Sequence, residues 1–265
     1  MPARKRWGQH FLASPETARR IIEAARVGPD DCVLEVGPGD GALTRVLAVT
    51  ARTVAAVEID PLRAEALAAE YAPEPRVRVF QGDVLRRPIA SWLDAAGCTG
   101  GALLVANLPY NAATPILFAA LESGGRIRRA VATVQREVAR RFIARPGQEG
   151  YGYLSVRAAA LAEGRVLFDL PPGAFRPRPK VISSVLELTP REVNASPDQL
   201  RRALTLASLG FNARRKTLAN ALSSAAPRSR WEEALSELGK STRARAEELS
   251  LDDFLLLARS WSPER

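Results

Sequence analysis

The sequence predicts an α/β fold, in which a seven-stranded Rossmann-like sheet precedes a small all-helical C-terminal domain. Short apolar runs alternate with segments of helical periodicity through the first 190 residues, which is typical of parallel sheets. A glycine-rich turn at residues 37–41 joins the first of these runs to a helix, as in nucleotide-binding α/β folds. Only helical patterns follow residue 190, so we predict two domains, residues 1–190 and 191–265.

Composition narrows the class of protein. The chain has 265 residues, of which 46% are hydrophobic, and its net charge of +9 favours a polyanionic partner. The two cysteines and the one histidine have no metal-ligand spacing, so we predict no structural zinc, no disulfide framework and no other metal site. No apolar run approaches the roughly 20 residues of a membrane span, and none follows the basic residues 3–6 as in a signal peptide. We therefore expect a cytoplasmic protein without a membrane partner.

The first 121 residues alternate predicted strands and helices. Ser14-Pro15 begins the first helix, because serine is a favoured N-cap and proline suits the first helical turn. Four apolar runs predict strands at Cys32–Val36, Thr53–Val57, Val77–Gln81 and Leu103–Ala106. Helices are predicted at Ala42–Ala48, Pro61–Glu70 and Thr114–Leu121.

Three predicted strands end in or near an acidic residue, namely Glu35, Glu58 and Asp83. Because the carboxyl ends of parallel strands meet at one edge of a sheet, these acids predict a nucleoside pocket, with Glu58 on the ribose hydroxyls. Each acid taken singly is also compatible with an ordinary turn residue or N-cap. The spacing Gly37-x-Gly39-x-x-Ala42 fits a dinucleotide fingerprint as well, so the loop alone does not choose between cofactors.

Asn107-Leu108-Pro109-Tyr110 follows the fourth predicted strand and predicts a site for a flat heterocycle with an amino group. Asn107 has a side-chain amide that both donates and accepts hydrogen bonds. Pro109 holds Leu108 in an extended conformation, so the Leu108 carbonyl can point into a pocket, and Tyr110 supplies an aromatic face. A strand-to-helix turn with Asn107 as N-cap is the structural alternative.

The second half of the chain completes the sheet and adds the helical domain. Strands are predicted at Arg129–Gln135, near Arg165–Phe168 and at Ser183–Leu188, and a helix at Arg136–Ala144. The proline-rich residues 171–180 predict an ordered loop. After a linker at residues 190–198, helical spacing predicts helices at Pro197–Ser208, Ala213–Leu222, Arg230–Leu238 and Leu251–Ser260.

Clusters of cations predict contacts with RNA phosphates. The signs of the charges do not alternate along these segments, although a solvated face is the usual meaning of charges on a helix. In the predicted helix 213–222 the cations occupy the first turn, where they oppose the helix dipole and a phosphate would relieve the conflict. The candidate RNA-binding residues are Arg126, Arg128, Arg136, Arg140, Arg141, Arg145, Arg176, Arg178, Lys180, Arg214, Arg215 and Lys216.

Taken in order, these motifs resemble the ribosomal RNA adenine dimethylase family of the KsgA type, over nearly the whole chain. The glycine loop alone is weakly specific, whereas several such motifs in this order are strongly specific. The similar segments are Gln9-His10-Phe11-Leu12, Glu35–Gly41, Asn107–Asn111, Ala174–Val181 with Ser184, and Arg214–Leu218 with Asn220. His10 departs from the asparagine that is usual in the family.

The resemblance implies a methyltransferase that uses S-adenosylmethionine and methylates N6 of two neighbouring adenosines near the 3′ end of small-subunit rRNA, within the assembling 30S subunit. It implies a catalytic domain at 1–190, an rRNA-binding domain at 191–265 and a monomer. The implied cofactor-binding residues are Gln9, His10, Leu12, Glu35, Gly37, Gly39, Glu58, Ile59, Asp83, Val84 and Asn107. The implied catalytic residues are Asn107, Leu108, Pro109, Tyr110 and Phe175, with Tyr110 and Phe175 stacking on the target base.

Three alternatives remain at this point. Dimethylases of 23S rRNA of the Erm type share the fold and the chemistry, but Leu108 and Arg214–Leu218 favour the small-subunit type. A NAD-dependent oxidoreductase explains the glycine loop and Glu58 but leaves Asn107–Tyr110 unexplained. A non-catalytic ribosome-assembly factor would not need the Asn107–Tyr110 motif.

Overall fold

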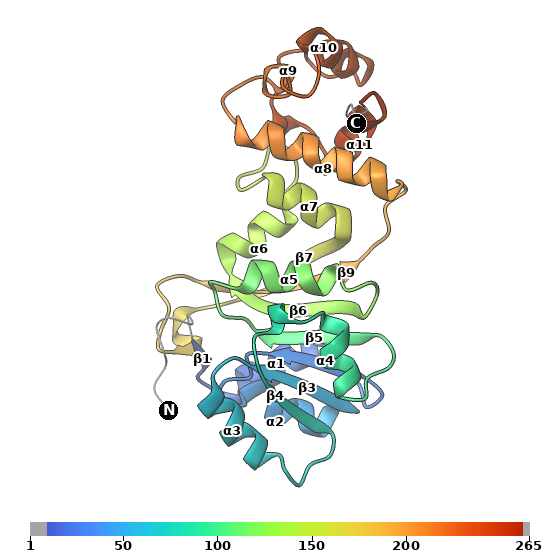
Figure 1. Cartoon of the computed structure of the whole chain (residues 1–265). Coiled ribbons are helices and arrows are strands. Elements are labelled where there is room, and N and C mark those ends of the chain that lie inside the picture. The colour runs from blue at the N-terminus through green and yellow to red at the C-terminus, as the bar shows by residue number, and fades with distance from the viewer. Residues whose placement is uncertain (1–9, 262–265) are drawn as a thin grey trace. The chain divides into compact units, whose positions relative to one another are not determined.

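The computed structural model describes residues 10–261, and the chain divides into two compact units (Figure 1). The first unit contains the described residues up to Ala139 together with Gly164–Pro190. The second unit contains Arg140–Glu163 and the described residues from Arg191 onward. The chain therefore passes between the units three times.

A seven-stranded sheet forms the centre of the first unit, in the order β4-β3-β2-β5-β6-β9-β7, so the predicted fold class is confirmed. The strands are β2 (Cys32–Val36), β3 (Thr53–Glu58), β4 (Val77–Gln81), β5 (Ala102–Asn107), β6 (Ile127–Gln135), β7 (Ala162–Leu170) and β9 (Ser183–Pro190). The first five of these are parallel, and β9 runs antiparallel to β6. The bounds of β2 and β4 are those that the sequence predicted.

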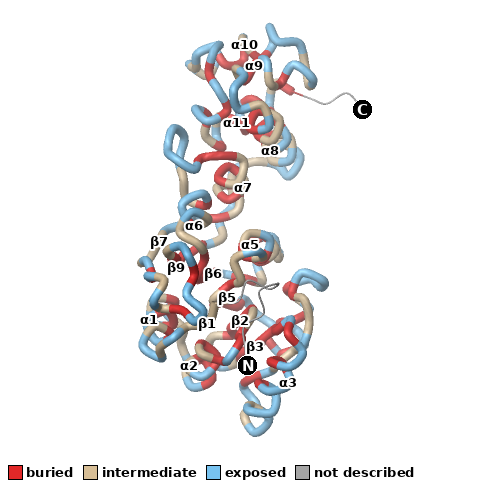
Figure 2. Tube along the Cα trace, turned by 90° about the vertical axis from the view of Figure 1, so that its left-hand side faces the viewer, coloured by how far each residue is buried: buried red, intermediate tan, exposed pale blue. Residues whose placement is uncertain are grey.

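The central strands are continuous apolar runs because both of their faces are covered. Every residue of β2 is buried, as are the first five residues of β5 (Figure 2). Parallel strands in the middle of a sheet lie under helices and so lack the alternation of a half-exposed strand. Because these strands are parallel, the carboxyl ends of β2, β3, β4 and β5 share one edge of the sheet. The sequence predicted the pocket at this edge.

The helices of the first unit pack around this sheet. They are α1 (Pro15–Ala25), α2 (Ala42–Thr50), α3 (Pro61–Glu70), α4 (Ile89–Ala95) and α5 (Ala113–Leu121). The Ser14 side chain accepts a hydrogen bond from the Thr17 backbone N–H at 3.2 Å, so the predicted N-cap of α1 is confirmed. Helix α4 was not predicted, because it spans only seven residues, too few to show helical periodicity.

A small two-stranded sheet joins segments that are far apart in the sequence. Strand β1 (Phe11–Leu12) pairs antiparallel with β8 (Phe175–Arg176), so Phe11 faces Arg176 and Leu12 faces Phe175. The sequence predicted only an ordered loop at residues 171–180. A strand of two residues has no period that a sequence pattern can reveal, and its pairing partner lies in another part of the chain.

The second unit is helical and has its own core. Its helices are α7 (Tyr153–Leu161), α8 (Pro197–Asn212), α9 (Leu218–Ala221), α10 (Arg228–Glu237), α11 (Leu251–Arg259) and the second half of α6 (Arg136–Ile143). Trp231 of α10 is fully buried, and its indole N–H donates to the Leu222 carbonyl at 3.0 Å. Val156 of α7 belongs to the same apolar cluster as Leu206 of α8.

The predicted domain bounds of 1–190 and 191–265 therefore need a correction. Residues 140–163 group with the C-terminal helices, because the apolar side chains of α7 are covered by α8 and α11. The sequence predicted a strand near residues 165–168 but missed α7 before it. Strand β7 is also longer than predicted, since it begins at Ala162 and ends at Leu170.

The cations at Arg214–Lys216 do not occupy the first turn of a helix. Helix α8 continues to Asn212 rather than ending at Ser208, and α9 begins only at Leu218. The cations lie in the turn that follows the C-terminus of α8, where positive charge is favourable toward the helix dipole. The prediction that a phosphate must relieve an unfavourable dipole was therefore wrong.

None of the helices among residues 10–261 is long and apolar enough to span a membrane. Among residues 10–261 there is also no group of three or more histidine, cysteine and acidic side chains that is arranged to hold a metal ion.

Candidate active site

A pocket opens at the carboxyl edge of the sheet in the first unit. The space between its lining residues, with the open mouth included, is about 410 Å³. It is lined by His10, Phe11, Gly37, Gly39, Glu58, Ile59, Asn107, Leu108 and Pro109. All of these except Phe11 were named as site residues from the sequence, so the structure brings the N-terminal segment, the glycine loop and the Asn107 motif together.

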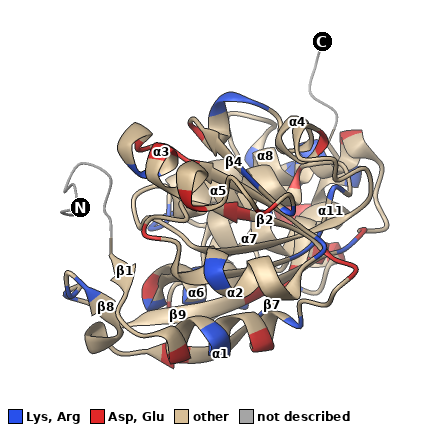
Figure 3. Cartoon of the chain, turned by 90° about the horizontal axis from the view of Figure 1, so that it is seen from below, with Lys and Arg blue, Asp and Glu red and all other residues tan. Residues whose placement is uncertain are grey.

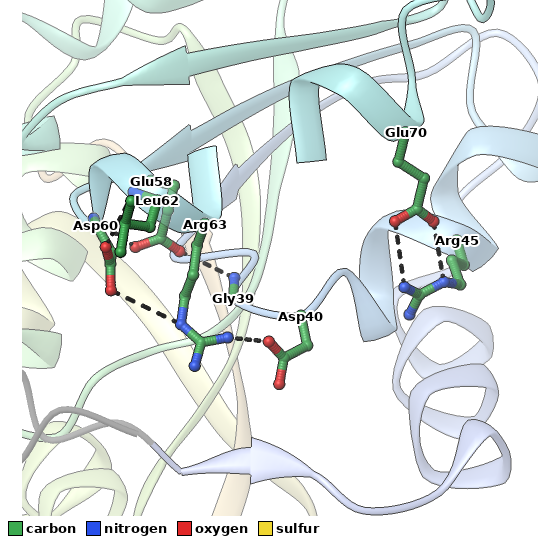
Figure 4. Close-up of polar contacts among 8 residues, drawn as sticks. All are labelled: Gly39, Asp40, Arg45, Glu58, Asp60, Leu62, Arg63 and Glu70. Atoms are coloured by element: carbon green, nitrogen blue, oxygen red, sulfur yellow. Dashed lines mark hydrogen bonds and ion pairs between the residues drawn. The ribbon is translucent and has the colours of Figure 1, made fainter. Parts of the chain in front are cut away.

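Glu58 lies at the end of β3 and holds the glycine loop in place. One carboxylate oxygen accepts a hydrogen bond from the Gly39 N–H at 2.9 Å, and the other accepts from the Asp60 N–H at 2.9 Å (Figure 4). The carboxyl group is almost fully buried, and burial raises the pKa of Glu58, whereas these two backbone donors oppose that rise. Glu58 is therefore both a pocket residue and the anchor of the loop.

Two features of position 39 favour glycine, namely its backbone conformation and the close approach of the Phe11 ring. Its φ is +59°, a region that side chains rarely adopt. A Cβ atom at this position would lie 2.7 Å from the ring of Phe11, which is too close for any carbon pair. The aromatic ring of the N-terminal segment therefore packs directly on the glycine loop.

Asn107 is the last residue of β5, and its side chain is already oriented. Its Nδ2 donates to the His10 carbonyl at 2.7 Å, which leaves Oδ1 as the atom available to accept. Asn107 is not a helix N-cap, because α5 begins at Ala113 and Ala112 is its capping residue. The structural alternative for Asn107 is thus excluded, although the structure does not test its catalytic role.

Both the hydroxyl and the ring of Tyr110 make contacts that fix its position. The hydroxyl shares a hydrogen bond of 2.5 Å with the Ser183 side chain, and burial raises the pKa of Tyr110. The His10 ring stacks on the Tyr110 ring, with 5.0 Å between the centroids and 27° between the planes. His10 Nδ1 also lies 2.7 Å from the Pro177 carbonyl. In this structure, the histidine that replaces the usual asparagine covers one face of the predicted stacking platform.

Several predicted site residues lie outside the pocket. Phe175 is fully buried in the apolar core of the first unit, and its stacking on a target base stays a prediction that this position does not support. Leu12 pairs with Phe175 in the small sheet and lines a different hollow, beside Arg19 and Val46. Gln9 falls outside the described residues. An aromatic side chain suits core packing and base stacking equally well, so the sequence alone does not distinguish these two positions for Phe175.

Asp83 and Val84 lie at the end of β4, next to β3, but they do not line the pocket. The Asp83 side chain accepts from the Leu85 N–H at 3.0 Å and so caps a short 3₁₀ helix, Val84–Arg86. Val84 is buried, and its carbonyl accepts from the Trp92 indole at 3.2 Å. Their predicted contacts with the cofactor stay predictions.

Glu35 has a structural partner within the fold. The Thr44 hydroxyl of α2 donates to the Glu35 carboxyl at 2.7 Å, and Glu35 is only 1% exposed. Burial raises the pKa of Glu35 to about 8, while the Thr44 hydrogen bond lowers it and the charge of Glu58 raises it. The predicted direct contact with a cofactor is not supported, because Glu35 does not line the pocket.

The raised pKa of Glu35 makes stability depend on pH. Between its ordinary pKa of 4.5 and about 8, the folded chain keeps a proton that the unfolded chain has released. The unfolding free energy is therefore expected to fall as pH rises through this window, by up to about 1.4 kcal/mol per pH unit. Glu35→Gln removes this contribution. Urea unfolding of both proteins at about pH 5, 7 and 9 measures it, and parallel pH profiles would contradict it.

Two of the predicted RNA-binding arginines have partners at the opposite edge of the sheet, where β6 begins. Arg126 donates to Asp94 at 2.8 Å and to the Cys98 carbonyl at 2.6 Å, and Arg128 pairs with Asp31. These two arginines tie neighbouring segments of the first unit together, and their role in RNA binding stays a prediction. Sequence spacing cannot show that an acid far along the chain neutralises a cation.

Most of the other predicted RNA-binding cations are exposed to solvent and so accessible to phosphates. Among the described residues, Arg136 makes a long ion pair with Asp169, at 3.7 Å. Exposed cations occur on α6, in and after β8, and in the turn after α8, and Figure 3 shows basic residues on α6 and near β8. These exposed residues are Arg140, Arg141, Arg145, Arg176, Arg178, Lys180, Arg214, Arg215 and Lys216. Arg214 also donates to the Tyr151 carbonyl at 3.2 Å, within the second unit.

Sequence reasoning missed Arg63, which is 2% exposed and lies beside the pocket. It pairs with Asp40 of the glycine loop, and its guanidinium lies 4.2 Å from the centroid of the Phe11 ring. The sequence around Arg63 does not indicate these contacts, because Asp40 and Phe11 lie in two other segments of the chain.

Comparison with known proteins gives consistent results over nearly the whole chain. Residues 1–262 match the family model described as "Ribosomal RNA adenine dimethylase". A protein of Synechococcus sp. (strain JA-3-3Ab), named "Ribosomal RNA small subunit methyltransferase A", is 42% identical over 96% of this chain and 91% of its own length. A protein of the same name from Methylococcus capsulatus (strain ATCC 33009 / NCIMB 11132 / Bath) is 38% identical over 98% of each chain.

Two solved structures have similar folds. The crystal structure of the 23S rRNA methyltransferase ErmE superposes with a TM-score of 0.73 and 30% identity, over 95% of this chain and 99% of that one. A dimethyladenosine transferase from Plasmodium falciparum has a TM-score of 0.75 and 24% identity, over 94% of this chain and 96% of that one. The latter supports the fold alone.

Proposed function

Because the chain belongs to the ribosomal RNA adenine dimethylase family, it is a methyltransferase of ribosomal RNA, and we propose that S-adenosylmethionine is its methyl donor. The substrate is N6 of two neighbouring adenosines near the 3′ end of small-subunit rRNA, in the assembling 30S subunit. The name and the 42% identity of the Synechococcus protein favour this substrate over 23S rRNA, since ErmE is only 30% identical.

The observation that carries this proposal is the position of Asn107. Its side chain lines the pocket at the end of β5, with Nδ2 engaged by the His10 carbonyl and Oδ1 left to accept. An exocyclic adenine amine has two N–H donors and a lone pair that is delocalised into the ring. Asn107 Oδ1 and the Leu108 carbonyl accept these two hydrogen bonds, which favours a pyramidal nitrogen with a nucleophilic lone pair.

Positioning and electrostatics then provide most of the rate enhancement. The two acceptors would hold the amine in one orientation in the pocket, which converts a bimolecular encounter into a reaction within one complex. No strong base is needed, because the amine proton becomes acidic only as the new C–N bond forms. The target adenosine must leave any stack to reach the pocket, and the monomethylated amine still has one N–H to donate in the second transfer.

The residues around the pocket suit S-adenosylmethionine. Each Glu58 oxygen already accepts one backbone N–H, but a carboxylate has about four acceptor positions, so two ribose hydroxyls can still be bound. Gly37 and Gly39 allow the backbone to approach the methionine part, and Ile59 is 40% exposed beside Glu58. When bound, the cofactor supplies an electrophilic methyl group on its sulfonium.

Methyl transfer to purified ribosomal particles tests the proposal. The protein should incorporate labelled methyl groups into 30S particles that lack this modification, and mass spectrometry of the rRNA should show two dimethylated adenosines. Methylation of 23S rRNA instead would assign the Erm-type activity. Tighter binding of NAD than of S-adenosylmethionine would refute the methyltransferase assignment of this site.

We further propose that the turn after α8 binds rRNA phosphates. Replacing Arg214, Arg215 and Lys216 with glutamine should weaken rRNA binding and flatten its salt dependence, by about 0.7–0.9 in the log–log slope per lost phosphate contact. Cofactor affinity should not change. Arg128→Gln is the matched control, because Arg128 is paired with Asp31 at the other edge of the sheet. If the salt dependence of rRNA binding were unchanged in the triple variant, these cations would not contact phosphates and would be ordinary solvated surface residues.

A further inference from the structure

We propose that Arg63 is a positioning residue of the cofactor pocket, which holds the Phe11 ring against the glycine loop so that the pocket is closed on that side. This inference rests on the proposed function, because it assigns Arg63 to the binding of S-adenosylmethionine. Arg63 does not line the pocket and acts through Phe11, which does.

Arg63 joins three segments of the first unit that surround the pocket. It lies in the first turn of α3 and is only 2% exposed. Its Nη1 pairs with Asp40, which lies in the glycine loop, and its Nε lies 3.8 Å from Asp60, the N-cap residue of α3 (Figure 4). Its guanidinium carbon lies 4.2 Å from the centroid of the Phe11 ring, in β1.

The geometry indicates that Arg63 fixes the position of the Phe11 ring and does not merely stabilise helix α3. A buried guanidinium is costly unless carboxylates compensate its charge, and here Asp40 and Asp60 do so from two directions. The hydrogen bond to Asp40 and the longer ion pair with Asp60 hold the guanidinium beside the Phe11 ring, and a cation over an aromatic face is an attractive arrangement. Phe11 cannot move outward without losing this contact.

The opposite side of the ring is fixed by the glycine loop. The Phe11 ring lies where a Cβ atom on Gly39 would clash at 2.7 Å, so the ring and the loop backbone are in direct contact. Gly39 also donates its N–H to Glu58, the residue assigned to the ribose hydroxyls. Arg63, Phe11, Gly39 and Glu58 therefore form a continuous row of contacts along one side of the pocket.

Arg45 provides a control, because it also makes an ion pair that involves α3. It lies in α2 and pairs with Glu70 of α3 at 3.2 Å, so it also ties α3 to a neighbouring segment (Figure 4). Arg45 is 55% exposed and does not line the pocket. Loss of Arg45 removes an ion pair to α3 without releasing Phe11.

The test compares Arg63→Met, Phe11→Leu, the double variant and Arg45→Met by calorimetric titration with S-adenosylhomocysteine. Arg63→Met and Phe11→Leu should each raise the Kd by about 5- to 30-fold, whereas Arg45→Met should stay within about twofold of the wild type. The double variant should bind about as weakly as the weaker single variant, because both substitutions remove the same contact. Arg63→Lys should recover part of the affinity.

A purely structural role is distinguished by kinetics. At saturating S-adenosylmethionine and 30S particles, kcat of Arg63→Met should stay within a few-fold of the wild type while KM for the cofactor rises. Unchanged Kd in Arg63→Met, or fold-changes that multiply in the double variant, would overturn the role of Arg63. A wild-type protein that binds no S-adenosylhomocysteine would instead refute the proposed function.

Discussion

Replacing Asn107 with alanine is expected to lower the single-turnover rate of methyl transfer by about 10²- to 10³-fold. The lost Oδ1 acceptor matters most when the adenine amine becomes pyramidal and its N–H acidic, so the hydrogen bond strengthens in the transition state. An interaction of this kind affects kcat more than substrate affinity. The measurement is a single-turnover assay at saturating 30S particles and cofactor.

Tyr110→Phe is the matched control for Asn107→Ala. It removes the 2.5 Å hydrogen bond to Ser183 but keeps the aromatic ring beside the pocket, so its rate should stay within about tenfold of the wild type. Asn107→Ala also removes the hydrogen bond to the His10 carbonyl, so cofactor affinity must be measured separately. A near wild-type rate for Asn107→Ala under these conditions would refute the role of Asn107 as the amine acceptor.

The second large effect is expected from Glu58→Gln, which should weaken S-adenosylmethionine binding by about 10- to 150-fold, or roughly 1.5–3 kcal/mol. A glutamine amide has only one acceptor oxygen, so its NH₂ group would face one of the two backbone donors, Gly39 or Asp60. The variant loses hydrogen bonds from a charged group to the ribose and loosens the glycine loop as well.

Calorimetry with S-adenosylmethionine and with NAD measures this effect directly. Glu70→Gln is the control, because Glu70 is an exposed carboxylate on α3 whose partner is Arg45. Its affinity for S-adenosylmethionine should equal that of the wild type. If Glu58→Gln bound S-adenosylmethionine within about twofold of the wild type, Glu58 would be a loop anchor without contact to the ribose.

Local chemistry explains why much of the sheet and the pocket could be predicted. Strands β2 and β4 were predicted to the residue, because apolar runs bounded by turn residues are visible without knowledge of the fold. Parallel strands then place Glu58 and Asn107 at one edge through topology alone, and both line the pocket.

Features that depend on distant partners were not predictable. Arg128 resembles any other exposed cation until the fold brings Asp31 to it. Phe175 has the same hydrophobic character whether it packs in a core or covers a base, and only the structure shows that it is fully buried. The contact of Arg63 with Phe11 joins residues that share no sequence pattern.

The second unit is interrupted in sequence, and this interruption affects synthesis of the chain. Residues 140–163 leave the ribosome before β9 completes the sheet, yet the apolar side of α7 is covered only by helices that are made later, beginning with α8. A nascent chain that has reached Pro190 therefore presents the uncovered side chains Val156 and Ala160. If the chain is divided at residue 190, one fragment contains α7 and the other contains α8 to α11. Neither fragment then contains the complete helical core. Until the last helices have formed, this side of α7 is exposed apolar surface of the kind that promotes aggregation.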